Sequence, residues 1–193
     1  PQGLRAVRAA VLGSPIAHSL SPVIHRAGYV AAGLTGWEYT AHEVDAAGLP
    51  GFVAGLDVSW RGLSLTMPLK EAAGSLAATV DAVATRAGAV NTLVRRTDGG
   101  WDATNTDVVG VVGALRPHLP AGATRALVLG SGATARSAVL ALADLGITTL
   151  TVRARDTAKA ADLLAWALGL DIGIRNGSVA ELAPTADLRT PEG

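Results

Sequence analysis

The sequence predicts an α/β fold, and three observations support that prediction. Short apolar runs alternate with helix-like stretches along the chain of 193 residues. A glycine-rich loop lies directly between one such run and a helix. Aromatic residues make up only 4% of the chain, whereas alanine supplies much of its 49% hydrophobic content. This composition argues against a large all-β sandwich packed on aromatic residues and favours closely packed helices.

The first half of the chain alternates predicted strands and helices. Residues 9–13 form an apolar run that ends at a glycine, and residues 22–32 are predicted to be a helix with proline in its first turn. The next predicted elements are a strand over 37–44, a helix within 46–56, a strand over 62–66 and a helix that begins near Pro68. Residues 89–96 and 101–105 flank Asp98-Gly99-Gly100, a turn sequence that predicts an antiparallel hairpin.

The second half has a clearer pattern. A helix over residues 108–115 is followed by a breaker-rich segment at 117–122. A strand over 126–129, a helix over 135–145 and a strand over 149–152 make a βαβ unit, which implies a parallel sheet with a right-handed crossover. A further helix over 156–168 and a third strand over 172–175 complete the predicted elements. We therefore expect two domains, residues 1–107 and 108–193.

The composition excludes several classes of protein. The formal net charge is zero, with 16 lysine and arginine residues against 16 aspartate and glutamate residues, so the chain offers no basic footprint for nucleic acid. It has no cysteine, which excludes disulfides, thiolate metal sites and a cysteine nucleophile. We find neither an apolar run approaching the ~20 residues of a membrane span nor a signal-peptide pattern. We expect a cytoplasmic protein with no nucleic-acid or membrane partner.

No metal is predicted, because the spacing of the histidines is not that of a metal site. These histidines are His18, His25, His42 and His118. We interpret His18 as a polar loop residue and the others as surface or packing residues.

The glycine-rich loop predicts a dinucleotide site. Its residues are Gly130, Ser131, Gly132, Ala133, Thr134 and Ala135, and they fit the pattern G-x-G-x-x-G/A between a strand and a helix. The first glycine allows the tight turn, the second lets backbone N–H groups approach a pyrophosphate, and the small third residue allows close packing of helix and strand. The alternative is a glycine turn that only packing requires.

The turn after the next strand bears on the choice of cofactor. Arg155 and Lys159 are spaced i, i+4 at the start of a helix, where both can face the 2′-phosphate of NADP. An acidic residue at this point binds the ribose of NAD instead, and Asp156 leaves that possibility open. An ordinary solvated basic pair is the other alternative. NADP is the cofactor we predict, with NAD possible.

Polar residues also gather at strand ends and before a helix in the first half. Ser19 and Ser21 precede a helix N-terminus, an arrangement that suits an anion, although Ser21 alone can simply cap that helix. The other polar residues follow or precede strands, where ligands bind in α/β sheets. They are Ser64, Thr66, Lys70, Asn91, Asn105, Thr106 and Asp107. Together these groups suit a small polyhydroxylated acid.

Five motifs in order resemble the shikimate dehydrogenase family. They are S-P-I-A-H-S-L-S-P-x-I-H, T-M-P-x-K, G-A-V-N-T-L, N-T-D-x-x-G and G-S-G-A-T-A. The resemblance implies NADPH-dependent, reversible reduction of 3-dehydroshikimate to shikimate, a step of aromatic amino-acid biosynthesis. It implies a substrate-binding catalytic domain followed by a Rossmann-type NADP domain, with the active site in the cleft between them.

The resemblance also implies roles for individual residues. Ser19 and Ser21 match the pair that binds the substrate carboxylate. Thr66, Asn91 and Asp107 match contacts to ring hydroxyls, and Ser64 stands where the family usually has an asparagine that contacts the substrate. Lys70 and Asp107 match the catalytic pair. This pairing is chemically sensible, because a lysine ammonium can stabilise and protonate the alkoxide that forms at the reduced carbon.

The chain departs from the family pattern in two further places. The usual N-R-T of the NADP site is Ala154-Arg155-Asp156 here. The family's later Rossmann strands, a tyrosine near the substrate and a C-terminal helix have no counterpart, so we expect the second domain to be C-terminally incomplete. Residues 186–193 resemble the family's A-D-L…T-P-x-G only faintly.

Two other functions stay open at this point. One is a quinate/shikimate dehydrogenase that prefers NAD. The other is a chain that binds a nucleotide or a shikimate-like acid without turning it over. For each of these possibilities we expect a small-molecule substrate or ligand and a monomer or homodimer.

Overall fold

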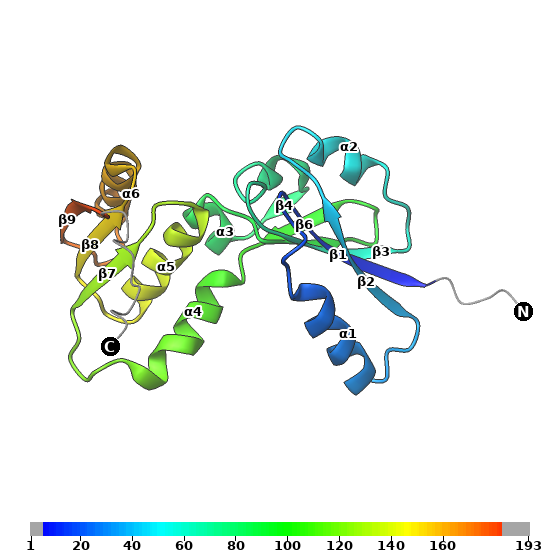
Figure 1. Ribbon diagram of the computed structural model, residues 1–193, viewed down its shortest axis with the longest axis horizontal. Coiled ribbons are helices and arrows are strands. Elements are labelled where there is room, and N and C mark those ends of the chain that lie inside the picture. The colour runs from blue at the N-terminus through cyan, green and yellow to red at the C-terminus, as the bar shows by residue number, and fades with distance from the viewer. Residues whose placement is uncertain (1–5, 183–193) are drawn as a thin grey trace, which may run out of the picture. The chain divides into compact units, whose positions relative to one another are not determined.

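The structure is a computed structural model that describes residues 6–182, and it divides into two compact units between Thr106 and Asp107 (Figure 1). The predicted division lay between residues 107 and 108; its assignment to two functional domains stays a prediction. The elements of unit 1 are β1 (Val7–Gly13), α1 (Ser21–Ala31), β2 (Trp37–Glu43), α2 (Leu49–Ala54), β3 (Trp60–Leu65), η1 (Ala73–Leu76), β4 (Thr79–Val80), α3 (Ala82–Ala87), β5 (Thr92–Arg95) and β6 (Trp101–Thr104). Those of unit 2 are α4 (Asp107–Leu115), η2 (Arg116–His118), β7 (Arg125–Leu129), α5 (Ala133–Asp144), β8 (Thr149–Ala154), α6 (Thr157–Gly169) and β9 (Asn176–Glu181).

Unit 1 is built on a mixed sheet with the strand order β2-β1-β3-β5-β6-β4. β1 is parallel to both β2 and β3, while β5 is antiparallel to both β3 and β6. Pairing of β5 with β6 around the Asp98-Gly99-Gly100 turn confirms the predicted hairpin. The parallel register places Gly13 opposite Glu43 and Leu12 opposite Leu65, so β1, β2 and β3 end at the same edge of the sheet.

Alternate residues of β1 bury their side chains on opposite faces of this sheet. Ala10 and Leu12 belong to the large core that α2 covers through Leu49 and Val53. Their neighbours Ala9 and Val11 belong to a smaller cluster with Tyr39, against which Tyr29 of α1 packs. Helices α1 and α2 therefore lie on opposite sides of the sheet, as Figure 1 shows. This period of two is the one expected of a strand buried on both faces.

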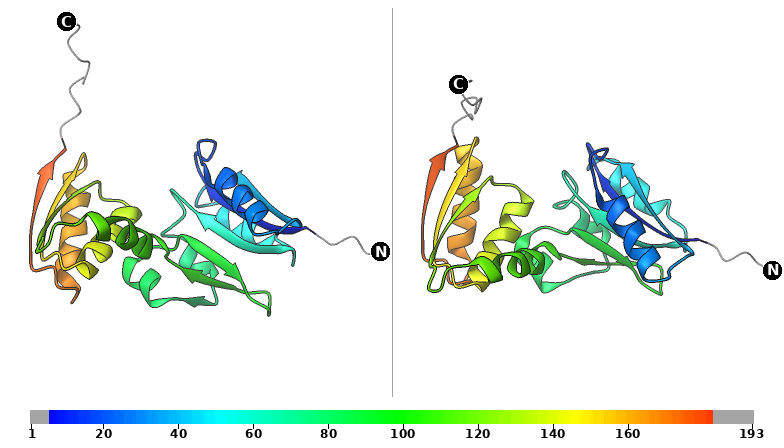
Figure 2. Two further views of the ribbon diagram at one scale, coloured as in Figure 1. Left: turned by 90° about the horizontal axis from the view of Figure 1, so that it is seen from below. Right: turned by 60° about the horizontal axis from the view of Figure 1, so that its bottom comes forward.

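Unit 2 is a parallel three-stranded sheet in the order β7-β8-β9. Helices α5 and α6 lie beside this sheet (Figure 2). Both contribute to one core with the sheet, which includes Val139, Leu150 and Leu163. The predicted βαβ unit is confirmed by β7, α5 and β8. Leu127 and Leu129 of β7 are 54% and 64% exposed, so the described residues leave their face of the sheet uncovered.

Two predicted helices of unit 1 differ from the structure. The prediction of a helix near Pro68 is wrong. Residues 67–72 form turns, and the next helical element is the short η1. The reason is tertiary, because the Lys70 carbonyl accepts a hydrogen bond from the Val90 N–H at 2.7 Å instead of continuing a helical ladder. α2 begins later than predicted, because Asp45 accepts a hydrogen bond from the Gly48 N–H at 2.8 Å and holds a turn before the helix.

The predicted third strand of the second half is also misplaced. Residues 172–175 are not a strand, and Gly173 has a φ of +87°, which interrupts extended backbone. The strand is β9, whose polar sequence shows little pattern and which is defined by parallel pairing with β8. Leu164 packs so closely over Gly177 that a side chain at this position would overlap it. Packing, and not local propensity, determines where this strand lies.

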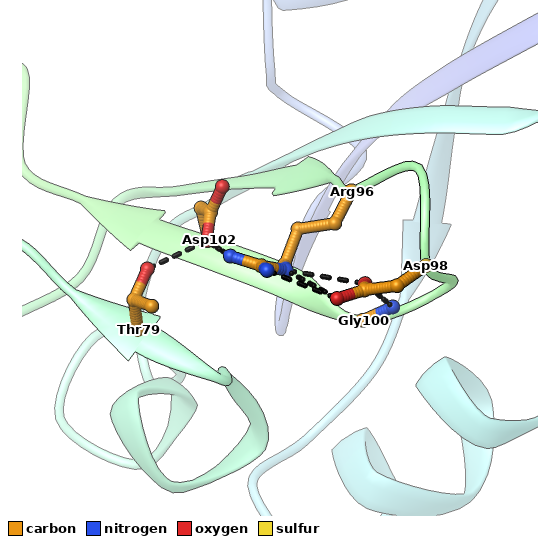
Figure 3. A network of polar contacts seen from close by, with 5 residues as sticks. All are labelled: Thr79, Arg96, Asp98, Gly100 and Asp102. Carbon is orange, nitrogen blue, oxygen red and sulfur yellow. Dashed lines mark hydrogen bonds and ion pairs between the residues drawn. The ribbon is translucent and has the colours of Figure 1, made fainter.

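Arg96 joins the two strands of the hairpin through a network of partly exposed charges (Figure 3). Its guanidinium donates to both Asp98 oxygens at 2.9–3.1 Å and to Asp102 at 2.9 Å. Thr79 of β4 donates to Asp102 at 2.5 Å, and the Gly100 N–H donates to Asp98 at 2.9 Å. The Arg96 bonds lower the pKa of Asp98, and the Thr79 and Arg96 bonds lower that of Asp102.

Replacing Gly13 with alanine should destabilise unit 1. The new Cβ would overlap the Thr66 methyl group and lie 2.9 Å from the Met67 carbonyl oxygen. Overpacking of this kind costs about 1–3 kcal/mol of unfolding free energy, which urea titration followed by circular dichroism will measure. Gly28→Ala is the matched control in helix α1, where a Cβ meets nothing within 4 Å and alanine gains about 0.5–1 kcal/mol. Equal stability of Gly13→Ala and the parent chain would contradict the close approach.

Arg96→Gln should lower the melting temperature more at neutral pH than in acid. The carboxylates of Asp98 and Asp102 have pKa values below those of the unfolded chain, so their contribution is present above about pH 4 and is lost as the pH falls. Thermal unfolding at several pH values should show the difference between variant and parent shrinking below about pH 4. Arg61→Gln, at an exposed arginine of β3, is the control. A pH-independent difference would show that the charges contribute nothing.

Candidate functional site

The candidate residues of unit 1 lie along one edge of its sheet. The parallel strands β1, β2 and β3 end there, and antiparallel β5 begins there, with Thr92 opposite Ser64. β6 ends at the same edge, where Thr104 pairs with Thr92. The residues that directly follow or precede these strand ends, among them Thr66 and Asn91, are therefore neighbours. This is the edge at which ligands bind in α/β sheets.

Hydrogen bonds between loops hold the segment after β3 against the end of β1. The Thr66 N–H donates to the Leu12 carbonyl at 2.9 Å, and the Ser14 N–H donates to the Met67 carbonyl at 2.9 Å. The Ser14–Pro15 and Met67–Pro68 peptide bonds are both cis. The loop that leads to Ser19 and the loop that carries Thr66 are thus fixed to each other at their starts.

Ser19 and Ser21 lie together at the N-terminus of α1. Both are partly buried, and Ser19 Oγ accepts a hydrogen bond from the Ser21 N–H at 3.3 Å. The N-cap of α1 is Leu20, whose side chain makes no capping hydrogen bond, and the first turn has no acidic residue. The alternative that Ser21 merely caps the helix is therefore wrong. Two hydroxyls beside a helix N-terminus can bind an anion.

Lys70 lies in a turn and is partly buried. Its backbone carbonyl accepts from the Val90 N–H at 2.7 Å, which places the turn beside the residue that precedes Asn91. Asn91 is only 9% exposed. Its Nδ2 donates to Thr106 Oγ1 at 2.9 Å, and its Oδ1 accepts from the Thr106 N–H at 3.0 Å. Asn91 therefore connects the edge of the sheet to the last residue of unit 1.

The segment Asn105-Thr106-Asp107 contains two residues that stabilise the fold, Asn105 and Thr106, and one candidate site residue, Asp107. Asn105 is 4% exposed and donates from Nδ2 to the Ala89 carbonyl at 2.9 Å, so this amide serves the fold. Thr106 is bound to Asn91, as described above. Asp107 is the first residue of α4 and of unit 2. The carboxylate is therefore carried by the residue directly after the Asn91–Thr106 contact.

The sequence did not point to Tyr39, a buried residue whose hydroxyl contacts the Ser64 side chain. Tyr39 is 2% exposed, and its hydroxyl donates to Ser64 Oγ at 2.7 Å. The His25 ring stacks on the Tyr39 ring at 3.9 Å between centroids, and His25 Nδ1 lies 2.9 Å from the Ser21 carbonyl oxygen. His25 is thus a packing residue, as predicted. The signal available in the sequence was a tyrosine at an inward position of a predicted strand, which by itself indicates only core.

An open hollow of about 540 Å³ lies beside this edge, at the ends of β1 and β2. It is lined by Ser14, Glu43, Val44, Asp45, Gly48 and Phe52. Its two carboxylates are exposed and would repel an acidic ligand, so the hollow does not extend the candidate site.

The glycine-rich loop of unit 2 fits a pyrophosphate. Gly130 has a φ of +105°, and Gly132 is the N-cap of α5. No side chain caps α5, its first turn has no acidic residue, and a Cβ on either glycine would meet nothing within 4 Å. The two glycines therefore are not required by close packing, which was the alternative explanation. They leave backbone N–H groups of the helix N-terminus approachable by an anion.

The turn between β8 and α6 differs in one respect from the prediction. Asp156 is the N-cap of α6: it accepts from the Lys159 N–H at 3.1 Å and lies 3.8 Å from Lys159 Nζ. Arg155 precedes this cap, so it lies outside the helix and the expected i, i+4 relation to Lys159 is wrong. Both cationic side chains are nevertheless exposed near the same helix N-terminus.

Two kinds of feature are absent from the described residues, 6–182. They contain no group of three or more histidine, aspartate or glutamate side chains that can hold a metal ion. Over the same range no helix is both long and apolar enough to cross a membrane.

Comparison with known proteins identifies close relatives. The family model of the shikimate dehydrogenase substrate binding domain matches residues 11–93. A shikimate dehydrogenase (NADP(+)) from Xanthomonas euvesicatoria is 41% identical over 186 residues, which cover 93% of this chain and 64% of that protein. The crystal structure of a shikimate 5-dehydrogenase from Mycobacterium fortuitum is 48% identical with a TM-score of 0.79, covering 94% of this chain and 65% of that one.

A shikimate 5-dehydrogenase from Thermus thermophilus extends the comparison to bound ligands. Its complex with shikimate is 32% identical with a TM-score of 0.77, covering 97% of this chain and 72% of that one. Its complex with NADP(H) and shikimate is 36% identical with a TM-score of 0.76, covering 88% and 62%. The chain spans 56% to 64% of the length of the curated relatives compared. On this evidence the chain belongs to the shikimate dehydrogenase family.

Proposed function

We propose that this chain is a shikimate dehydrogenase, which catalyses the reversible, NADPH-dependent reduction of 3-dehydroshikimate to shikimate. The observation that carries the proposal is the gathering of Ser64, Thr66, Lys70 and Asn91 at one edge of the unit 1 sheet. These residues lie within the segment that matches the family's substrate-binding domain. A relative with this fold was solved in complex with shikimate.

Each polar group of the site has a counterpart on the substrate. Ser19 and Ser21 at the N-terminus of α1 bind the carboxylate, because hydroxyl donors and a helix N-terminus both favour an anion. The ring hydroxyls are bound by the remaining groups, which all accept hydrogen bonds and, except for the Asp107 carboxylate, also donate them. These groups are Ser64, Thr66, Asn91 and Asp107.

Lys70 and Asp107 form the catalytic pair. When bound, NADPH supplies the hydride to the ketone carbon. The oxygen then gains negative charge, which the Lys70 ammonium stabilises by a hydrogen bond and neutralises by giving up a proton. Asp107 accepts a hydrogen bond from the neighbouring substrate hydroxyl and so orients the ring. In the reverse direction Lys70 takes the proton from the substrate hydroxyl.

NADP is the cofactor that we propose for unit 2. The loop Gly130–Ala135 would hold the pyrophosphate at the N-terminus of α5, and Arg155 and Lys159 would hold the 2′-phosphate. Asp156 was the reason to consider NAD and quinate, but its carboxylate already caps α6 and pairs with Lys159. That observation favours NADP. We further propose a cytoplasmic enzyme that works as a monomer or homodimer on small molecules.

Lys70→Ala should abolish most turnover while leaving shikimate binding. Loss of a general acid lowers kcat by about 10²–10⁴-fold, whereas the carboxylate and hydroxyl contacts remain. Shikimate-dependent reduction of NADP⁺ followed by absorbance gives the rate, and calorimetry gives the affinity for shikimate. Lys159→Ala, the chain's other lysine, is the control: it should raise KM for NADP⁺ and leave shikimate affinity unchanged. An unchanged rate in Lys70→Ala would remove Lys70 from the mechanism.

Arg155→Ala should weaken NADP⁺ binding about tenfold or more and leave NAD⁺ binding unchanged, because only NADP⁺ carries the 2′-phosphate. Calorimetry with both nucleotides measures the two affinities. Arg153→Ala, at an exposed arginine of β8, is the matched control. Equal losses for the two nucleotides would contradict a 2′-phosphate site at Arg155.

A chain that binds shikimate and a nucleotide without turnover is the second candidate function. It is favoured by the exposed Leu127 and Leu129 on one face of the unit 2 sheet. Calorimetric binding of shikimate together with no NADP⁺ reduction would select this function. Measured turnover would eliminate it.

A further inference from the structure

A buried tyrosine lies directly behind one of the proposed substrate contacts. Tyr39 belongs to β2 and Ser64 to β3, and β1 lies between these strands. The Tyr39 side chain crosses β1 on the face where Ala9 and Val11 lie, and its hydroxyl reaches Ser64 Oγ at 2.7 Å. Tyr39 is 2% exposed, whereas Ser64 is only partly buried. Ser64 can therefore contact a ligand that Tyr39 cannot reach.

The direction of this hydrogen bond determines what Ser64 can offer. Tyr39 donates and Ser64 Oγ accepts. The Ser64 hydroxyl keeps its own hydrogen, which is then directed away from Tyr39. A serine on a strand has several staggered rotamers, and a hydrogen bond from a fixed partner selects one of them. Ser64 is thus prepared as a hydrogen-bond donor in a defined direction.

Tyr39 is well suited to hold this geometry. Its ring is stacked between the sheet and His25, with an interplanar angle of 10°. Burial raises the pKa of the Tyr39 hydroxyl, so the phenol remains protonated at neutral pH and continues to donate. Arg26 also donates from Nε to the Tyr39 carbonyl at 3.0 Å. Both the ring and the backbone of Tyr39 are therefore held by α1.

The same contacts connect Ser64 to the other end of the proposed substrate site. His25, which stacks on Tyr39, lies 2.9 Å from the Ser21 carbonyl oxygen through Nδ1. A continuous path of contacts runs from Ser21 through His25 and Tyr39 to Ser64. Ser21 is proposed to bind the substrate carboxylate and Ser64 a ring oxygen, so this path fixes the spacing between two groups that contact the same ligand.

We infer that Tyr39 is a positioning residue, which orients the Ser64 hydroxyl to donate a hydrogen bond to a ring hydroxyl oxygen of the bound polyhydroxylated acid. The inference rests on the proposed function, in which Ser64 contacts shikimate. It explains how a serine, which is shorter than an amide side chain, presents a directed donor at this position.

A double-mutant cycle on shikimate affinity tests the inference without requiring turnover. Tyr39→Phe removes only the hydroxyl, and Ser64→Ala removes its partner. Each change should weaken shikimate binding roughly three- to tenfold, the range that one hydrogen bond contributes. The double variant should bind no more weakly than Ser64→Ala, because the Tyr39 hydroxyl acts only through Ser64. Tyr29→Phe, at the neighbouring tyrosine, is the matched control and should bind like the parent chain.

A second ligand separates positioning from a general loss of structure. Cyclohexene-1-carboxylate keeps the acid group of shikimate but has no ring hydroxyls, so Tyr39→Phe should leave its affinity unchanged. Equally weakened binding of both ligands would overturn the inference, because it would show a merely structural role.

Ser64→Ala is the fallback variant if Tyr39→Phe does not fold. Unchanged shikimate affinity in Ser64→Ala overturns the inference. Failure of the parent chain to bind shikimate would refute the proposed function, whereas tight binding by both parent and Tyr39→Phe would refute only the positioning role.

Discussion

The parallel pairing of β1 with β2 and β3 is the constraint on which the candidate site depends. Because the three strands run in one direction and in close register, the loops that follow them begin at the same edge of the sheet. Gly13 allows the closest approach, since a side chain there would overlap Thr66. Hydroxyls and a lysine from segments about fifty residues apart in the sequence are thereby brought to one place.

The antiparallel half of the sheet adds the amide of Asn91 to this edge. Asn91 is held by Thr106 through both ends of its side chain, and Asn105 is held by the Ala89 carbonyl. Buried amides that are left without partners cost free energy, so these contacts fix the chain where it leaves unit 1. Asp107 follows directly. The backbone that leads to Asp107 is therefore held, up to Thr106, by hydrogen bonds that stabilise the fold of unit 1.

The features that were predictable from the sequence are those with a local physical cause. Apolar runs that end at Gly13 and Gly130, the Asp98-Gly99-Gly100 turn and the helix after the glycine-rich loop all have such causes, and each is present. The predictions that failed did so because of contacts between residues far apart in the sequence. The helix expected near Pro68 is prevented by the contact with Val90, and β9 is defined by pairing with β8. Tyr39 carries no local sign of its role, because its partner Ser64 is 25 residues away on a strand that is not its neighbour.

The charges at the turn between β8 and α6 favour the binding of a phosphate group there, independently of any sequence motif. The turn carries two positive charges, on Arg155 and Lys159, against the one negative charge of Asp156, and all three side chains are exposed. The Asp156 carboxylate is used to cap α6, where it also complements the positive end of the helix dipole. An excess of positive charge attracts a dianionic 2′-phosphate, whereas a ribose hydroxyl gains little from it. The charges of the turn therefore support the proposed choice of NADP, even though its sequence departs from the family's usual pattern.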